Sequence, residues 1–85
     1  MADYDFSDFI REKNRACSDD VLEESYVGLM SVCPAKCGRT AGCTAFTLEG
    51  VTFGHKPAHK CKLYASCDQA TEKLDTDVYR MKQFR

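Results

Sequence analysis

The fold is decided by residues 33–47, CPAKCGRTAGCTAFT, where three cysteines lead from a predicted helix into a predicted strand. Ser31 suits the N-cap of a helix, and Pro34 is tolerated in a first turn, where its missing N–H is not needed. Gly38 suits the C-terminal end of such a helix. We therefore expect one helix of two to three turns, beginning at Ser31 or earlier, near Tyr26.

Outward from this stretch, alternating apolar and polar residues predict an antiparallel sheet. Strands are expected at residues 43–48, 60–64 and 77–84, with a strand or turn at 22–30 and a short strand or arm within the leading segment 1–16. Glu49-Gly50 predicts a turn, residues 51–59 a loop or irregular edge, and residues 68–76 a polar connection. The predicted fold class is α+β, with one helix packed on a mostly antiparallel β-sheet of about five strands.

The composition is that of a small folded domain with many cysteines. Of the 85 residues, 44% are hydrophobic and 29% are charged, which argues against disorder. The net charge of -1 argues against a nucleic-acid partner, and the short apolar runs argue against membrane insertion. Six cysteines in so short a chain favour a disulfide-stabilised, secreted extracellular domain. The acidic start has no signal-peptide pattern, so we expect a domain of a longer secreted protein.

The six cysteines allow 15 pairings, which helix geometry narrows. Cys33 and Cys37 lie four residues apart on the predicted helix, so their Cβ atoms are about 5–6 Å apart, against about 3.8 Å in a disulfide. Each can instead reach a cysteine of the predicted sheet or of the turn that leads into it. Cys37 can reach Cys43 across the tight 38–42 turn, and Cys33 can reach Cys61 on the inward face of its predicted strand. Cys17 and Cys67 then pair by elimination, which gives three nested links.

The spacing resembles the core pattern of the apple/PAN domain family, carried here by Cys33-x3-Cys37-x5-Cys43-x-Ala45-Phe46-Thr47 and Cys61-x-Leu63. The resemblance implies a single apple/PAN domain over residues 1–85, with a disulfide-bonded core at 17–67. It also implies that the first two of these cysteines lie on the helix, that Cys33 bonds Cys61, and that Cys37 bonds Cys43.

The outer cysteines, Cys17 and Cys67, lie well inside the ends of the chain. In this the chain departs from the apple domains of blood proteases and is similar to those of apicomplexan microneme adhesins. That similarity implies a non-enzymatic module, stored in micronemes before release, that helps to attach the parasite to host-cell surface proteins or glycans. It also implies neighbouring apple domains in a longer parent chain.

The candidate ligand-binding residues are concentrated in one segment. His55, Lys56, His59, Lys60 and Lys62 supply five cationic or titratable side chains within eight residues. Such a cluster fits a sulfated or sialylated glycan or an acidic protein patch, although a solvated surface gives the same pattern. Phe53, in the same predicted loop, is a candidate for stacking on a sugar ring.

Other functions find less support in the sequence. Cys33-x3-Cys37 has no second matching pair, so we expect no metal site and no cofactor. A cysteine with His55 or His59 is the one plausible nucleophile–base set, and no catalytic motif accompanies it, so we expect no enzyme. A protein-interaction or spacer domain, and a growth-factor or inhibitor-like domain, remain as alternatives.

Overall fold

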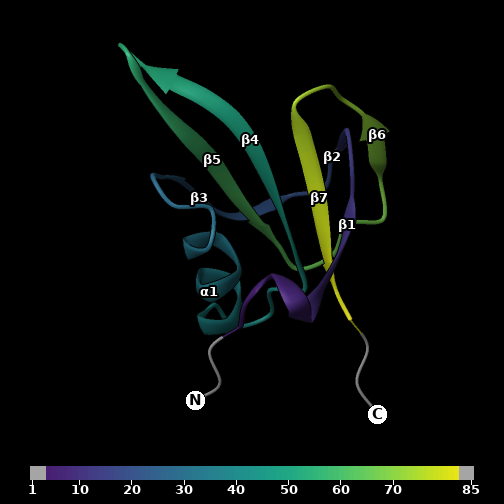
Figure 1. The fold of residues 1–85 in the computed structure, drawn as a ribbon. Helices are drawn as coiled ribbons and strands as arrows, with labels where there is room; N and C mark the ends of the chain where they lie inside the picture. Colours follow the sequence, from purple (N-terminus) through teal and green to yellow (C-terminus); the bar gives the residue numbers. More distant parts are fainter. Residues whose placement is uncertain (1–3, 83–85) are drawn as a thin grey trace.

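The computed structural model describes residues 4–82, which form a main sheet, one helix and a small second sheet (Figure 1). The main sheet has five strands in the order β1-β7-β4-β5-β3, and all its neighbours are antiparallel. They span Phe9–Glu12 (β1), Val21–Val27 (β3), Ala45–Phe53 (β4), Lys56–Tyr64 (β5) and Thr76–Met81 (β7). The other elements are the helix Val32–Arg39 (α1), the small sheet of Arg15–Cys17 (β2) with Ala70–Glu72 (β6), and the 3-10 turn Phe6–Asp8 (η1). The predicted α+β class is confirmed.

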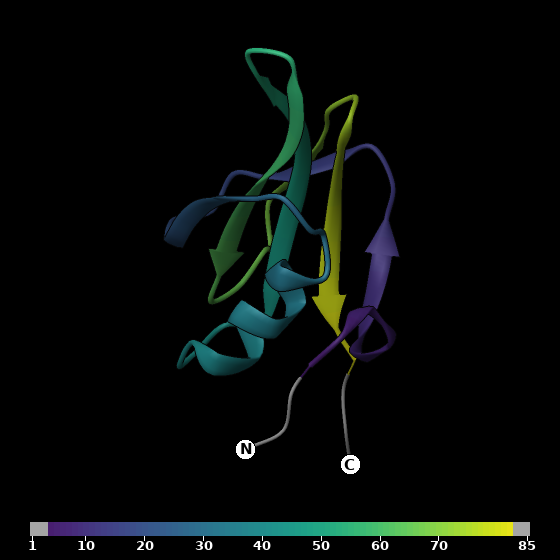
Figure 2. The same cartoon turned by 60° about the vertical axis from the view of Figure 1, so that its left-hand side comes forward.

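Helix α1 packs against one face of the main sheet, in front of β4 and β5 in Figure 2. Its buried side chains are Cys33, Pro34 and Cys37. At its end, the N–H of Thr40 donates to the carbonyl of Cys37. Ser31 is the N-cap residue, as predicted, but its backbone is helical and its side chain makes no capping hydrogen bond. The short helix is therefore held by its buried, disulfide-bonded cysteines and not by a side-chain cap.

The helix-side core is built around Phe46 of β4, which is completely buried. Its ring stacks on Tyr79 of β7 at 4.7 Å between centroids and meets Phe9 of β1 edge-on at 4.8 Å. Phe6 of η1 adds a tilted contact with Tyr79 at 5.2 Å. The leading segment is therefore part of the core, because β1 pairs with β7 and brings these rings together.

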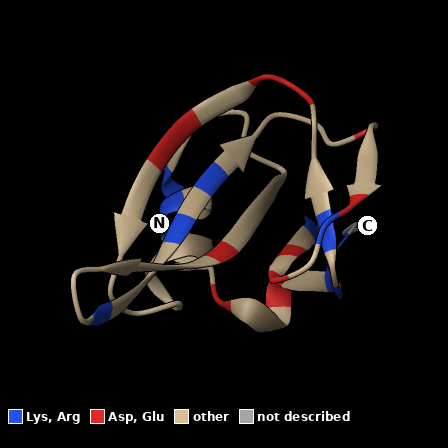
Figure 3. Ribbon diagram, turned by 90° about the horizontal axis from the view of Figure 1, so that it is seen from above, with Lys and Arg blue, Asp and Glu red and all other residues tan. Residues whose placement is uncertain are grey.

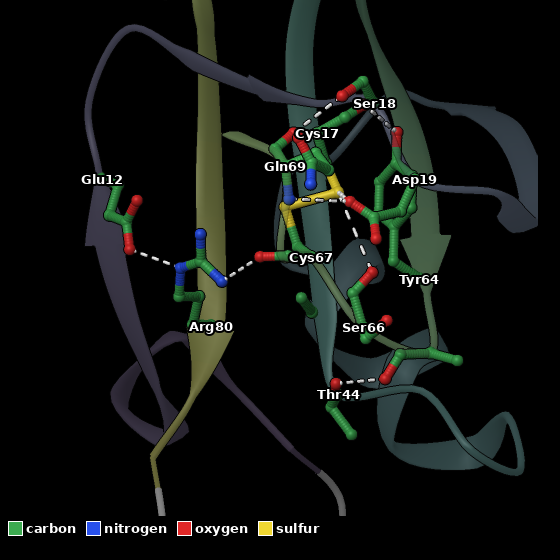
Figure 4. Close-up of a disulfide and its surroundings, with 12 residues drawn as sticks. Glu12, Cys17, Ser18, Asp19, Thr44, Tyr64, Ser66, Cys67, Gln69 and Arg80 are labelled. Atoms are coloured by element: carbon green, nitrogen blue, oxygen red, sulfur yellow. Dashed lines mark hydrogen bonds and ion pairs between the residues drawn. A yellow bond between two sulfur atoms is a disulfide. The ribbon is translucent and has the colours of Figure 1, made fainter. Parts of the chain in front are cut away.

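A second, smaller core lies on the other face of the sheet. Ala45, Tyr64, Cys67 and Val78 are buried there, and the partly buried Cys17 and Ala70 pack against them. Figure 4 shows the Cys17–Cys67 disulfide beside the Tyr64 hydroxyl, which donates to the carbonyl of Cys17 at 3.3 Å. The small β2–β6 sheet thus closes this face over part of its length.

Three disulfides join the cysteines, in the nested pairs expected from the sequence. Their Cα–Cα distances are 5.6 Å for Cys17–Cys67, 5.8 Å for Cys33–Cys61 and 5.3 Å for Cys37–Cys43. The second bond ties α1 to β5, and the third ties its C-terminal end to the segment before β4. By the loop-entropy argument each contributes roughly 2–4 kcal/mol to the free energy of unfolding.

The predicted turn at Glu49-Gly50 and the predicted loop over residues 51–59 are wrong. Strand β4 continues to Phe53 and pairs with β5 from Lys56 onward, so the two form one long hairpin. Its turn falls at Gly54, whose φ of 61° favours glycine. Gly50 lies inside the ladder, opposite His59, and its N–H donates to the carbonyl of Asp75. Pairing on both sides therefore outweighs the weak strand preference of glycine.

Two other boundaries differ from expectation. Residues 68–76 contain the short strand β6, which pairs with β2 and was expected to be only a connection. The final strand ends at Met81, and Phe84, expected at the end of a strand over 77–84, lies outside the described residues. Strand β1 pairs with β7 across 66 to 72 residues of sequence and β2 pairs with β6 across 53 to 57, and local patterns do not report such distant pairs.

Gly38→Ala is expected to lower the free energy of unfolding by about 1 kcal/mol, although this change in an open helix raises it by up to about 1 kcal/mol. A Cβ at Gly38 would lie 2.7 Å from Cδ1 and 3.0 Å from Cβ of Tyr4, so the tyrosine must shift. Urea unfolding of Gly38→Ala, Tyr4→Ala and the double variant measures the coupling. We expect the loss at Gly38 to shrink or reverse once the ring is gone; strictly additive effects would contradict the close contact.

Candidate functional site

One face of the β4–β5 hairpin gathers most of the expected ligand-binding side chains. The Cys33–Cys61 bond fixes the side of β5 that carries Cys61 as the helix side, so its neighbour Lys60 lies on the opposite side. Tyr26 of β3 pairs with Lys60 and shares that side. This surface, the hairpin face, carries Tyr26, Phe53, Lys56, Lys60 and Lys62. Figure 3 shows the basic residues of β5 between acidic residues of β3 and β4.

The hairpin face carries an exposed pair of aromatic rings. Tyr26 is 51% exposed and Phe53 is 52% exposed, and their centroids lie 4.8 Å apart with the rings at 80°. The Nζ of Lys60 lies 5.9 Å from the centre of the Tyr26 ring. An edge-to-face pair holds both rings in place while leaving part of each available to a ligand. Phe53 is therefore exposed, as its predicted role requires, and its contact with a ligand stays a prediction.

The lysines of the hairpin face flank this aromatic pair. Lys56 lies opposite Phe53 near the turn, and Lys62 lies nearer the C-terminal end of β5, roughly 20 Å away at about 3.3 Å per residue. Within residues 4–82 neither makes an ion pair. Lys60 lies 3.6 Å from a carboxylate oxygen of Glu24, a surface contact worth about 1 kcal/mol at most. Lys56 and Lys62 therefore keep their charge for an anionic ligand, although Glu24 and Glu49 lie on the same side of the sheet.

The two histidines do not join the lysines in one cluster. His55 is exposed in the turn of the hairpin, whereas His59 shares the side of β5 that carries Cys61 and lies on the helix side of the sheet. The eight-residue cluster expected from the sequence is therefore divided between two faces. The reason is that the segment is a strand, in which alternate side chains point in opposite directions, and not the predicted loop.

Tyr26 is the site residue that sequence reasoning missed. It lies about 30 positions before the lysine segment and reaches it only because β3 is the edge strand beside β5. The sequence did predict a strand or turn over residues 22–30, which contain Tyr26, but it did not predict which strand this segment pairs with. The partner depends on long-range pairing, which short patterns do not encode.

A cavity of about 340 Å³ lies on the helix side of the sheet, where it includes His59. Here Arg11 donates to Asp77 through Nε at 2.9 Å and approaches the same oxygen with a second nitrogen at 2.7 Å. The hydrogen bond to Asp77 raises the pKa of Arg11. Burial raises the pKa of Tyr79, which also lines the cavity. The sequence did not predict this helix-side cavity. Of its lining residues, only His59 was a candidate ligand-binding residue.

A cavity of about 600 Å³ lies beside the Cys17–Cys67 disulfide, on the other face of the sheet. Arg80 lines this cavity, and its guanidinium group donates to Glu12 and to the carbonyl of Cys67, as Figure 4 shows. The other charged residues of the lining are Asp68 and Lys82.

The described residues contain one grouping of three potential metal ligands, Cys17, Asp19 and Cys67. Its two sulfurs form a disulfide, so they are not thiolate ligands. All six cysteines are bonded, and none is a free thiol that could serve with a histidine as a nucleophile in this structure.

Comparisons with family models, with curated proteins and with solved structures found no match for this chain. Among residues 4–82, no helix has both the length and the apolar character needed to cross a bilayer.

Proposed function

We propose that this chain is a non-enzymatic extracellular recognition module of the apple/PAN type that binds anionic glycans on its hairpin face. The observation that carries the proposal is the exposed Tyr26–Phe53 pair, flanked by Lys56 and Lys62, which have no ion-pair partner in the described part of the chain. Rings offer a surface for the C–H face of a sugar, and ammonium groups attract sulfate or carboxylate groups. The similarity to microneme adhesins supports a role in attachment to host cells.

The scaffold suits recognition by a fixed surface. Three disulfides and paired strands hold the hairpin, so its side chains lose less freedom on binding than those of a loose loop. A single domain of this kind is expected to bind weakly. Tandem copies in a longer parent chain would raise the overall affinity through effective concentration.

The double change Lys56→Gln/Lys62→Gln is expected to weaken heparin binding by about tenfold or more, since charge-assisted hydrogen bonds contribute about 1.5–3 kcal/mol each. Heparin chromatography in a salt gradient measures the change as earlier elution. The matched control is Lys13→Gln/Lys82→Gln, which removes the same charge outside β3 and the β4–β5 hairpin. Equal effects in both variants would show that only net charge matters and would overturn the proposed site.

A protein partner is the second candidate, favoured by a different surface. Leu29, Met30 and Val32, in and beside the connection from β3 to α1, are all exposed, Leu29 by 70%. Adjacent exposed apolar residues are typical of a contact surface. If this surface carries the function, Leu29→Ser will abolish attachment to host cells while heparin retention stays unchanged.

A further inference from the structure

The hairpin face carries its two unpaired ammonium groups far apart. Lys56 lies beside the turn of the hairpin, which projects beyond the other strands in Figure 1, and Lys62 lies near the opposite end of β5. Their backbone positions are roughly 20 Å apart at about 3.3 Å per residue. Physiological salt largely screens exposed charges that are more than about 8 Å apart. One small anion is therefore held by one of these lysines and gains little from the other.

The middle of the hairpin face has charges that compensate one another. The Nζ of Lys60 lies 3.6 Å from a carboxylate oxygen of Glu24, and the Nζ of Lys73 lies 3.4 Å from a carboxylate oxygen of Glu49. Glu49 lies opposite Lys60 in the β4–β5 ladder and shares its side of the sheet. Two ammonium groups thus face two carboxylates here, and the uncompensated positive charge lies on either side of them.

The aromatic pair lies in the interval between the two ends. Tyr26 comes from β3 and Phe53 from β4, and these strands flank β5, so the contact between the rings crosses β5. Tyr26 pairs with Lys60, and Phe53 pairs with Lys56, so the rings meet between these two positions of the strand. Each ring is about half exposed. The interval therefore offers an apolar surface to the C–H faces of sugar rings.

We propose that the hairpin face binds an extended, linear anionic glycan that lies along β5. One anionic group of the chain contacts Lys56, a second contacts Lys62, and the sugar rings between them pack on Tyr26 and Phe53. The inference rests on the function proposed above and narrows its ligand to glycans that carry anionic groups along a chain.

The two lysine contacts are coupled through the ligand. Once the glycan has bound at one end, its own chain holds the next anionic group near the second lysine at a high effective concentration. A fragment that is too short to reach from Lys56 to Lys62 gains only one of the two contacts. Affinity is therefore expected to rise in a step when the fragment becomes long enough to span about 20 Å of strand.

The test is an amide NMR titration of the isotope-labelled, oxidised 85-residue chain with chondroitin sulfate fragments from the disaccharide to the decasaccharide. Methyl sialoside serves as the probe with a single anionic group. We expect the Kd of the longest fragment to lie about tenfold or more below that of the disaccharide and of the sialoside, because only the long chain makes both charge-assisted contacts. The long fragment is expected to shift the amides of Lys56, Lys62 and Tyr26 together.

Single lysine variants test the coupling. In Lys56→Gln and in Lys62→Gln the step with fragment length is expected to disappear, so that the longest fragment binds about as weakly as the disaccharide. Lys13→Gln removes the same charge outside β3 and the hairpin, and it is expected to keep the step. The amide spectrum of each variant verifies that it is folded.

Three results would overturn the linear arrangement. The first is an equal Kd for the disaccharide and the longest fragment; if the lysine variants still weaken binding, the proposed function survives without it. The second is a step that persists in Lys56→Gln or Lys62→Gln, which places the second contact elsewhere. The third is no saturable shift on the hairpin face with any fragment. Heparin retention is measured separately and then decides whether the proposed function fails as well.

Discussion

Replacing Cys33 and Cys61 together by alanine is expected to lower the free energy of unfolding by about 3.5 kcal/mol or more. The bond closes a loop with a sequence separation of 28, for which the loop-entropy model gives about 3.5 kcal/mol. Both sulfurs lie in the helix-side core and are completely buried, so their loss also leaves space there. Small domains have only about 5–15 kcal/mol of stability in total, so this change removes a large share of it.

The helix should show the effect most strongly. Helix α1 has eight residues, and isolated helices of fewer than about 12 residues are marginal in water. Urea unfolding measures the total loss, and hydrogen exchange of the α1 amides measures the local loss. The control is Cys37→Ala/Cys43→Ala, which opens a separation of only 6 and is expected to cost about 2 kcal/mol. A smaller loss for the Cys33–Cys61 pair than for this control would contradict the account of the fold.

Phe46→Ala is expected to cost about 3–5 kcal/mol, the range for truncating a buried phenylalanine. Its ring is completely buried and contacts rings from three segments of the chain: Phe6 before β1, Phe9 in β1 and Tyr79 in β7. No single neighbour can fill the space that it leaves. The same change removes the ring on which Tyr79 stacks.

Phe53→Ala is the matched control, since it makes the same chemical change at a ring that is 52% exposed. We expect it to cost at most about 1 kcal/mol, the worth of its contact with Tyr26. Thermal and urea unfolding of both variants compare the two positions. Similar losses for Phe46→Ala and Phe53→Ala would mean that Phe46 is not the centre of the core.

The features that could be predicted from the sequence are those fixed by local geometry. Cys33 and Cys37 lie on one helix, and that spacing excludes their pairing with each other; Cys33 bonds Cys61 of β5, and Cys37 bonds Cys43 in the segment before β4. Phe46 and Leu48 alternate with their neighbours, and both are buried as expected. In each case the relation spans a few residues, over which backbone geometry alone decides the outcome.

The features that could not be predicted depend on distant pairing. The dipeptide Glu49-Gly50 is typical of a turn. Gly50 is nevertheless part of a strand, because it pairs with β5 on one side and donates to the carbonyl of Asp75 on the other. The same long hairpin moves His59 to the opposite face from Lys60. Tyr26 reaches the hairpin face from β3 and Tyr79 reaches the core from β7, and their places follow from the strand order and not from any local motif.

The central claim is that the hairpin face recognises anionic glycans, and a glycan array tests it most directly. The oxidised domain would be displayed multivalently beside the Lys56→Gln/Lys62→Gln variant and a reduced, alkylated sample. We predict retention on sulfated or sialylated glycans that is strong for the oxidised domain, about tenfold weaker for the lysine variant and lost after reduction. Equal retention of the lysine variant, or no retention of the oxidised domain on any anionic glycan, would contradict the claim.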